Sequence, residues 1–142
     1  MATLVLGIGN TLRGDDGVAA HVLELLEAQG CGFQLMATLS LVPELASDIA
    51  QNDRVIFVDA DVGVREVTLQ RLDERQRDAL HRYAPASVVS FARTIGFQGD
   101  AWVCRVPVQS METEVALSAL AIDSAQEAAR MLGALREAAP RR

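Results

Sequence analysis

Short apolar runs alternate with helical stripes of apolar residues along this chain. Continuous apolar runs at 3–8 and 55–58 predict strands that are buried on both faces, as in a parallel sheet. Further strands are predicted at 33–38, 67–72 and 101–107, and apolar residues at helical spacing predict helices at 17–29, 42–51, 85–95 and 114–138. This alternation predicts one α/β domain over residues 1–142: three layers, α/β/α, around a mostly parallel sheet of about five strands.

The loop after the first strand carries the most distinctive polar residues. Gly7 and Gly9 resemble the start of a dinucleotide-binding turn, but Leu12 stands where the third glycine of that fingerprint belongs. We therefore expect the two glycines to provide a positive φ or a close backbone approach. For the adjacent Asp15 and Asp16, two interpretations remain open: carboxylates at a functional edge of the sheet, or residues that cap a helix N-terminus.

A second acidic position follows the other fully apolar strand. Asp59 comes directly after the run at 55–58, and the carboxyl ends of parallel strands meet at one edge of a sheet. We therefore expect Asp16 and Asp59 to share a cleft, with His81 entering from the loop before the helix at 85–95. The alternatives are that Asp59 only accepts local hydrogen bonds and that His81 is a solvated side chain in the charged stretch 73–82.

Two carboxylates and an imidazole suit a divalent metal such as zinc, iron or nickel. Without a metal, the same groups form a general acid–base pair. A serine or cysteine nucleophile has little support, because there is no Gly-x-Ser-x-Gly motif and neither cysteine lies beside a histidine.

The amino-acid composition limits the classes of partner that the protein can bind. The net charge of −6 argues against nucleic acid and against an anionic membrane surface as partners. No apolar stretch approaches the ~20 residues of a membrane span, and no signal peptide is visible. We expect Cys31 and Cys104 to be reduced, buried and inert, and the protein to be cytoplasmic and monomeric.

The residues just described, with several further blocks, resemble the [NiFe]-hydrogenase maturation proteases. The resemblance starts with the Leu-Gly-Ile-Gly-Asn motif and acidic pair within 6–18, and continues through Pro43–Ala46, Val55–Ala60, His81–Gly96 and the region of Leu117 and Ser118. The blocks occur in the family's order and spacing and span nearly the whole chain.

The resemblance implies a phosphorylase/hydrolase-like fold and an endopeptidase. Such an enzyme removes a short C-terminal extension from the hydrogenase large-subunit precursor after nickel insertion. The family's metal-binding positions fall on Asp16, Asp59 and His81, which are also the implied catalytic residues. Their implied role is to recognise the nickel of the substrate, with water as the attacking group. The alternatives are a non-catalytic nickel-site chaperone and, less favoured, a peptidyl-tRNA-hydrolase-like enzyme.

Two single residues and one short segment depart from the family pattern. Asp16 stands where some members have Glu. The aspartate side chain is one methylene shorter but offers the same carboxylate oxygens as ligands. Ala19 replaces a glycine. The segment 40–42, Ser-Leu-Val, stands where members have a glycine-rich or His-Gln-Leu segment, which predicts a different cleavage motif or a divergent hydrogenase partner.

Overall fold

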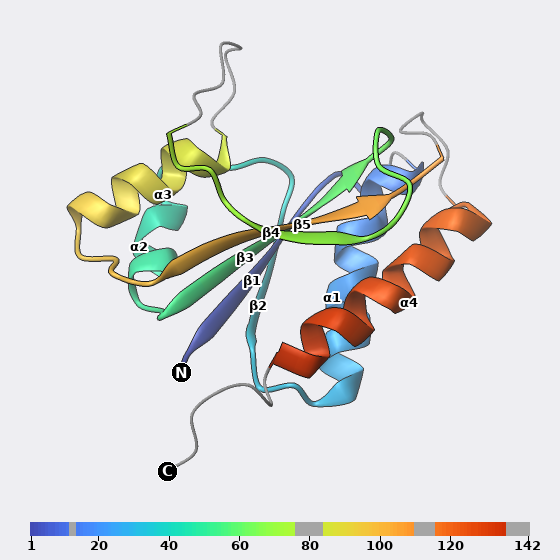
Figure 1. The fold of residues 1–142 in the computed structure, drawn as a ribbon, viewed down its shortest axis with the longest axis horizontal. Coiled ribbons are helices and arrows are strands. Elements are labelled where there is room, and N and C mark those ends of the chain that lie inside the picture. The colour runs from blue at the N-terminus through green and yellow to red at the C-terminus, as the bar shows by residue number, and fades with distance from the viewer. Residues whose placement is uncertain (12–13, 76–83, 110–115, 136–142) are drawn as a thin grey trace.

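The computed structural model describes residues 1–11, 14–75, 84–109 and 116–135. A five-stranded sheet lies between two pairs of helices (Figure 1). In chain order the elements are β1 (Thr3–Ile8), η1 (a 3-10 turn, Gly14–Gly17), α1 (Val18–Gln29), β2 (Gln34–Thr38), α2 (Leu45–Ala50), β3 (Arg54–Asp61), β4 (Thr68–Arg71), α3 (Pro85–Thr94), β5 (Asp100–Pro107) and α4 (Ala119–Ala134).

The strand order is β2-β1-β3-β5-β4, with β4 antiparallel at one edge and all other pairs parallel. The predicted α/β class and the mostly parallel sheet are confirmed. The two apolar strands, β1 and β3, are adjacent and central, and Ile8 at the end of β1 pairs with Asp59 on β3. The carboxyl ends of β2, β1, β3 and β5 therefore form one edge, which is where ligands bind in open α/β sheets.

The side chains of each strand point alternately into two separate hydrophobic cores, one on each face of the sheet. On one face of the sheet, Val5 and Ile56 pack with α1 and α4. On the other face, Leu4 and Phe57 pack with α2 and α3. Because side chains alternate along a strand, Asp59 points to the same face as Phe57, the face that α2 and α3 cover.

Helix boundaries follow local backbone signals. Gly30 ends α1 in the left-handed conformation at φ +65°, and its N–H donates to the Glu27 carbonyl at 3.0 Å. Pro85 occupies the first turn of α3, as predicted.

Two predicted helix starts are wrong. The second helix begins at Leu45, after a turn at Pro43 and Glu44, and not at residue 42. The last helix begins at Ala119, because the side chain of Ser118 caps it; residues 116 and 117 precede the helix.

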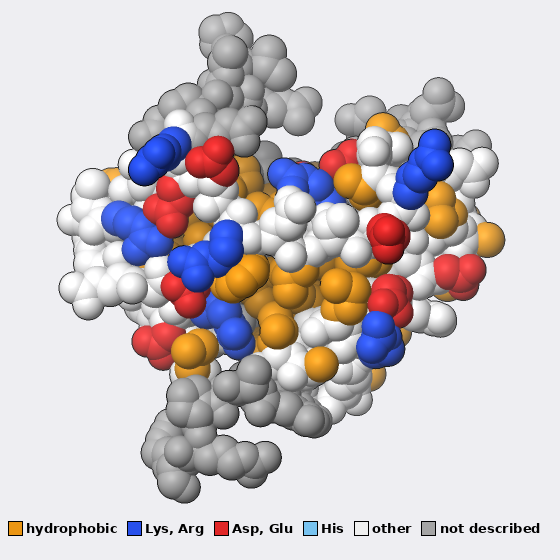
Figure 2. All heavy atoms as spheres, viewed as in Figure 1, with side chains coloured by type: hydrophobic (Ala, Val, Ile, Leu, Met, Phe, Trp, Pro, Cys, Tyr) orange, Lys and Arg blue, Asp and Glu red, His pale blue; other side chains and the backbone are white. Residues whose placement is uncertain are grey.

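The face of the molecule in front of β4 combines apolar and charged regions. Figure 2 shows hydrophobic side chains at its centre, with Arg, Asp and Glu side chains on both sides. Within the described ranges, no helix is both long enough and apolar enough to cross a membrane.

Candidate functional site

The structure brings Asp16 and Asp59 together at the carboxyl edge of the central strands. Asp59 lies near the end of β3, and Asp16 lies in η1, which follows the loop after β1. Burial, and second to it the negative charge of Asp16, raise the pKa of Asp59 from its ordinary 3.8 to about 6. Asp59 is therefore ready to gain or lose a proton near neutral pH, and a nearby cation would favour its charged form.

Asp16 is held by the backbone of the preceding loop. The N–H of Asn10 donates to Asp16 Oδ2 at 2.9 Å. Gly9 has φ +154°, and a Cβ there would lie 2.0 Å from the Asp16 carbonyl oxygen. Gly9 thus fulfils the predicted requirement for a positive φ and a close approach, and it allows the loop to pack directly against the turn that carries Asp16.

Asp15, next in the chain, has a different environment. Its side chain is only 3% exposed and accepts hydrogen bonds from elements far away in sequence. Asp15 Oδ2 accepts from the Gln109 N–H at 2.8 Å and from Ser118 Oγ at 2.7 Å, and Oδ1 accepts from the Ser118 N–H at 2.7 Å.

The N-cap position of α1 is occupied by Gly17, which makes no side-chain cap hydrogen bond. Asp15 and Asp16 precede that position, in η1. The cap in this region belongs to α4, where Ser118 Oγ accepts from the Ala121 N–H at 3.1 Å. A serine before an apolar helical stretch is a readable start signal, but its link to Asp15 cannot be read from sequence.

One cation lies beside the acidic pair. Arg105 sits opposite Asp59 in the β3–β5 register, and its Nε lies 3.6 Å from Asp61 Oδ2. Arg105 acts to lower the pKa of Asp59, but burial and Asp16 outweigh it. Among these four described groups, carboxylates outnumber the guanidinium, so the edge favours a positively charged ligand.

His81 lies outside the described residues, so the third predicted site residue is not located. Within the described part of the chain, no group of three or more His, Cys, Asp or Glu side chains is placed to hold a metal ion. Asp16 and Asp59 offer oxygen ligands, but two carboxylates do not complete a metal site. A further ligand has to come from this chain or from a substrate.

The described cysteines do not provide a nucleophile. Cys31 and Cys104 are both buried free thiols, as predicted. Cys104 is 0% exposed, and burial raises its pKa to about 12, so it carries no thiolate near neutral pH.

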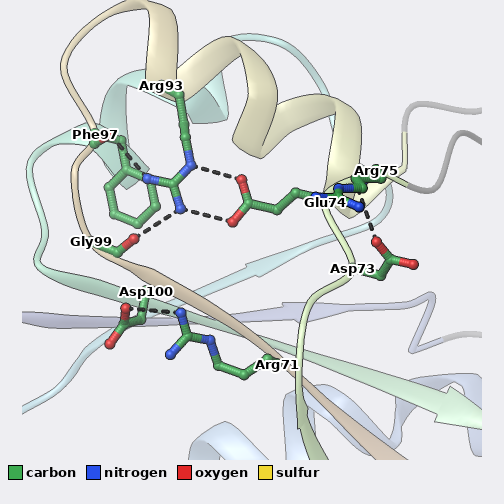
Figure 3. Close-up of polar contacts among 8 residues, drawn as sticks. All are labelled: Arg71, Asp73, Glu74, Arg75, Arg93, Phe97, Gly99 and Asp100. Carbon is green, nitrogen blue, oxygen red and sulfur yellow. Dashed lines mark hydrogen bonds and ion pairs between the residues drawn. The ribbon is translucent and has the colours of Figure 1, made fainter.

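An ion pair fixes the chain on both sides of residues 76–83. Arg93 on α3 donates from Nε and Nη2 to the two Glu74 carboxylate oxygens at 2.7 and 2.8 Å (Figure 3). Arg93 also donates to the carbonyl oxygens of Phe97 at 3.2 Å and Gly99 at 2.9 Å, and its guanidinium lies over the Phe97 ring. This two-point contact anchors the chain after β4 to α3.

Comparisons with known proteins identify the fold. No protein-family model matches the chain, and no curated protein matches it. Solved structures do. The hydrogenase maturating endopeptidase HybD from Escherichia coli superposes with a TM-score of 0.76 at 25% identity, over 97% of this chain and 94% of that one.

Two archaeal structures agree with that match. The [NiFe] hydrogenase maturation protease HycI from Thermococcus kodakarensis has a TM-score of 0.78 at 21% identity, over 96% of this chain and 92% of that one. HybD from the same organism has a TM-score of 0.73 at 17% identity, over 96% of this chain and 99% of that one. Over nearly its full length, this chain is therefore a structural homologue of the [NiFe]-hydrogenase maturation proteases.

Proposed function

We propose that this protein is an endopeptidase that removes a C-terminal extension from the nickel-loaded large-subunit precursor of a [NiFe]-hydrogenase. The observation that carries the proposal is the pairing of Asp16 with Asp59 at the carboxyl edge of β1 and β3. This pairing occurs in a chain that superposes on HybD over 97% of its length. Fold likeness alone would not assign an activity, but a paired acidic site at the functional edge of that fold supports one.

In this proposal Asp16, Asp59 and His81 recognise the nickel ion carried by the substrate. Carboxylate oxygen and imidazole nitrogen are suitable ligands for nickel. The raised pKa of Asp59 supports the role, because the repulsion between two carboxylates is relieved when a cation lies between them. For His81, support comes from α3, which begins at Pro85 soon after it in sequence and packs on the face that Asp59 points to.

Nickel recognition makes cleavage conditional on cofactor loading. With the metal of the substrate held at the carboxylates, the scissile peptide bond lies against the edge of the sheet. Water then adds to the carbonyl carbon, the C–N bond breaks, and the released amine takes the proton. The hydroxyl of the attacking water stays on the new carboxyl group, and its proton goes to the released amine.

Exposed apolar side chains beside the acidic pair suit a protein substrate. Leu39, directly after β2, is 69% exposed, and Val62, directly after β3, is 59% exposed. These residues lie on either side of the end of β1 in the strand order. Apolar side chains next to a charged centre are typical of surfaces that bind another protein. We place the reaction in the cytoplasm, where the two free thiols remain reduced.

The test is a processing assay read by intact-protein mass. Purified protein is incubated with large-subunit precursor that has or has not been loaded with nickel. Loss of a C-terminal peptide from the loaded precursor alone supports the proposal. An unchanged mass in both samples, with a nickel-dependent complex still formed, would replace the protease with a nickel-site chaperone.

A further inference from the structure

Adjacent carboxylates in one short turn have opposite surroundings. Asp16 lies beside Asp59 at the edge of the sheet, whereas Asp15 is almost completely buried and accepts its hydrogen bonds from Gln109 and Ser118. The separations in sequence are 94 residues to Gln109 and 103 to Ser118. One side chain therefore joins η1, the chain after β5 and the start of α4.

The same turn is held on its other side by the loop after β1. The Asn10 N–H binds the Asp16 side chain, and Gly9 packs against the Asp16 carbonyl. The position of Asp16 thus depends on two sets of contacts, local ones from Gly9 and Asn10 and long-range ones through Asp15. A side chain at a functional site needs supporting contacts of this kind to keep its geometry.

We propose that Asp15 is a positioning residue, which directs Asp16 toward Asp59 by tying η1 to Gln109 and Ser118. The inference depends on the proposed peptidase function only for its kinetic readout. Asp15 does not touch the substrate. It acts through the turn that carries Asp16, and its loss moves that carboxylate without removing it.

The donor pattern explains why an aspartate is needed. Both oxygens of Asp15 accept from backbone N–H groups, Oδ2 from Gln109 and Oδ1 from Ser118. In Asp15→Asn, one oxygen becomes an NH₂ group, which can only donate. Whichever way the amide turns, one backbone N–H loses its acceptor and faces another donor. The turn must then shift to relieve the contact.

The experiment combines amide hydrogen exchange with cleavage kinetics. In Asp15→Asn we expect the Asn10 amide, which binds Asp16, to exchange about tenfold faster than in the wild type. We expect kcat for precursor cleavage to fall about a hundredfold while KM changes little. The precursor still binds, but the Asp16 carboxylate is no longer aligned with Asp59.

Variants of Ser118 and Leu132 separate positioning from stability. Ser118→Ala removes one of the hydrogen bonds to Asp15 and should have a smaller effect, whereas Ser118→Thr keeps the hydroxyl and should restore wild-type behaviour. Leu132→Ala is the matched control, because Leu132 is fully buried in α4 but has no role at Asp15. It should lower Tm without lowering kcat under conditions where every variant is folded.

The proposal is overturned if Asp15→Asn changes Asn10 exchange and kcat no more than Leu132→Ala does at a similar Tm. A purely structural role for Asp15 gives that result. If the wild type cleaves no precursor, the proposed function fails. The hydrogen-exchange rate of the Asn10 amide then still tests the positioning role of Asp15.

Discussion

Asp59 and Asp16 come from different elements, β3 and η1, yet the charge on Asp16 contributes to raising the pKa of Asp59 to about 6. A carboxylate such as Asp59, whose charged form is disfavoured by burial and by a neighbouring negative charge, reduces the stability of the folded protein near neutral pH. A fold retains such a pair where function needs it.

Asp59→Asn should stabilise the protein above the pKa of Asp59. Because the folded-state pKa lies above 3.8, the folded state is favoured most below that pH and loses stability as pH rises through about 6. The variant has no such loss, so at about pH 8 its free energy of unfolding should exceed the wild-type value by up to roughly 2–3 kcal/mol.

Urea denaturation across pH measures the effect of Asp59→Asn. The difference from wild type should vanish below pH 3.8, where both side chains are neutral. Asp123→Asn, at an exposed position on α4, is the control and should show no such trend. A variant less stable than wild type at every pH would contradict the account of Asp59.

Gly9→Ala should be among the more damaging small substitutions. Alanine disfavours φ +154°, and its Cβ would lie 2.0 Å from the Asp16 carbonyl oxygen, so the backbone must move. We expect a loss of about 2–4 kcal/mol in unfolding free energy. Gly30→Ala is the control: it also has a positive φ but nothing within 4 Å, and it should cost only about 1 kcal/mol. Equal losses in the two variants would argue against close packing at Gly9.

Glu74→Gln should weaken the anchor between the chain after β4 and α3. The pKa of Glu74 is lowered, chiefly by its hydrogen bonds from Arg93, so the stabilisation is present above the ordinary value of 4.5 and disappears as pH falls. At neutral pH we expect a loss of about 1 kcal/mol by chemical denaturation, since both side chains are about one-third exposed. Glu127→Gln, in an exposed ion pair with Arg130 on α4, should change nothing measurable.

His81→Ala should abolish processing and leave thermal stability nearly unchanged. The reason is that His81 is proposed as a ligand for the substrate's nickel and lies in the highly charged stretch 73–82. Thermal unfolding and cleavage are measured on the same preparation. A large drop in Tm would show that His81 is part of a core and would remove it from the site.

Features set by local sequence were the easiest to predict. The apolar runs of β1 and β3 correctly predicted central parallel strands, and the carboxyl ends of parallel strands lie at one edge of the sheet, where Asp59 and the turn that carries Asp16 are found. The start of α2 was harder to predict, because a proline such as Pro43 occurs both in turns and at the first position of a helix. In the structure α2 begins two residues later, at Leu45.

The role of Asp15 was beyond sequence reasoning for a different reason. Its partners, Gln109 and Ser118, are distant in the chain, so only the folded arrangement of β5 and α4 against η1 makes the contact visible. The sequence pattern assigned Asp16 to the site, but it gave no sign that the adjacent Asp15 is buried. Tertiary structure makes one of them a buried anchor and leaves the other at the functional edge.

The most direct test of the central claim is the intact mass of a nickel-loaded large-subunit precursor after incubation with wild-type protein and with Asp59→Asn. We expect the wild type to release a C-terminal peptide and Asp59→Asn, although at least as stable, to release none. Cleavage by Asp59→Asn at the wild-type rate would contradict the claim that the paired carboxylates recognise the nickel of the substrate.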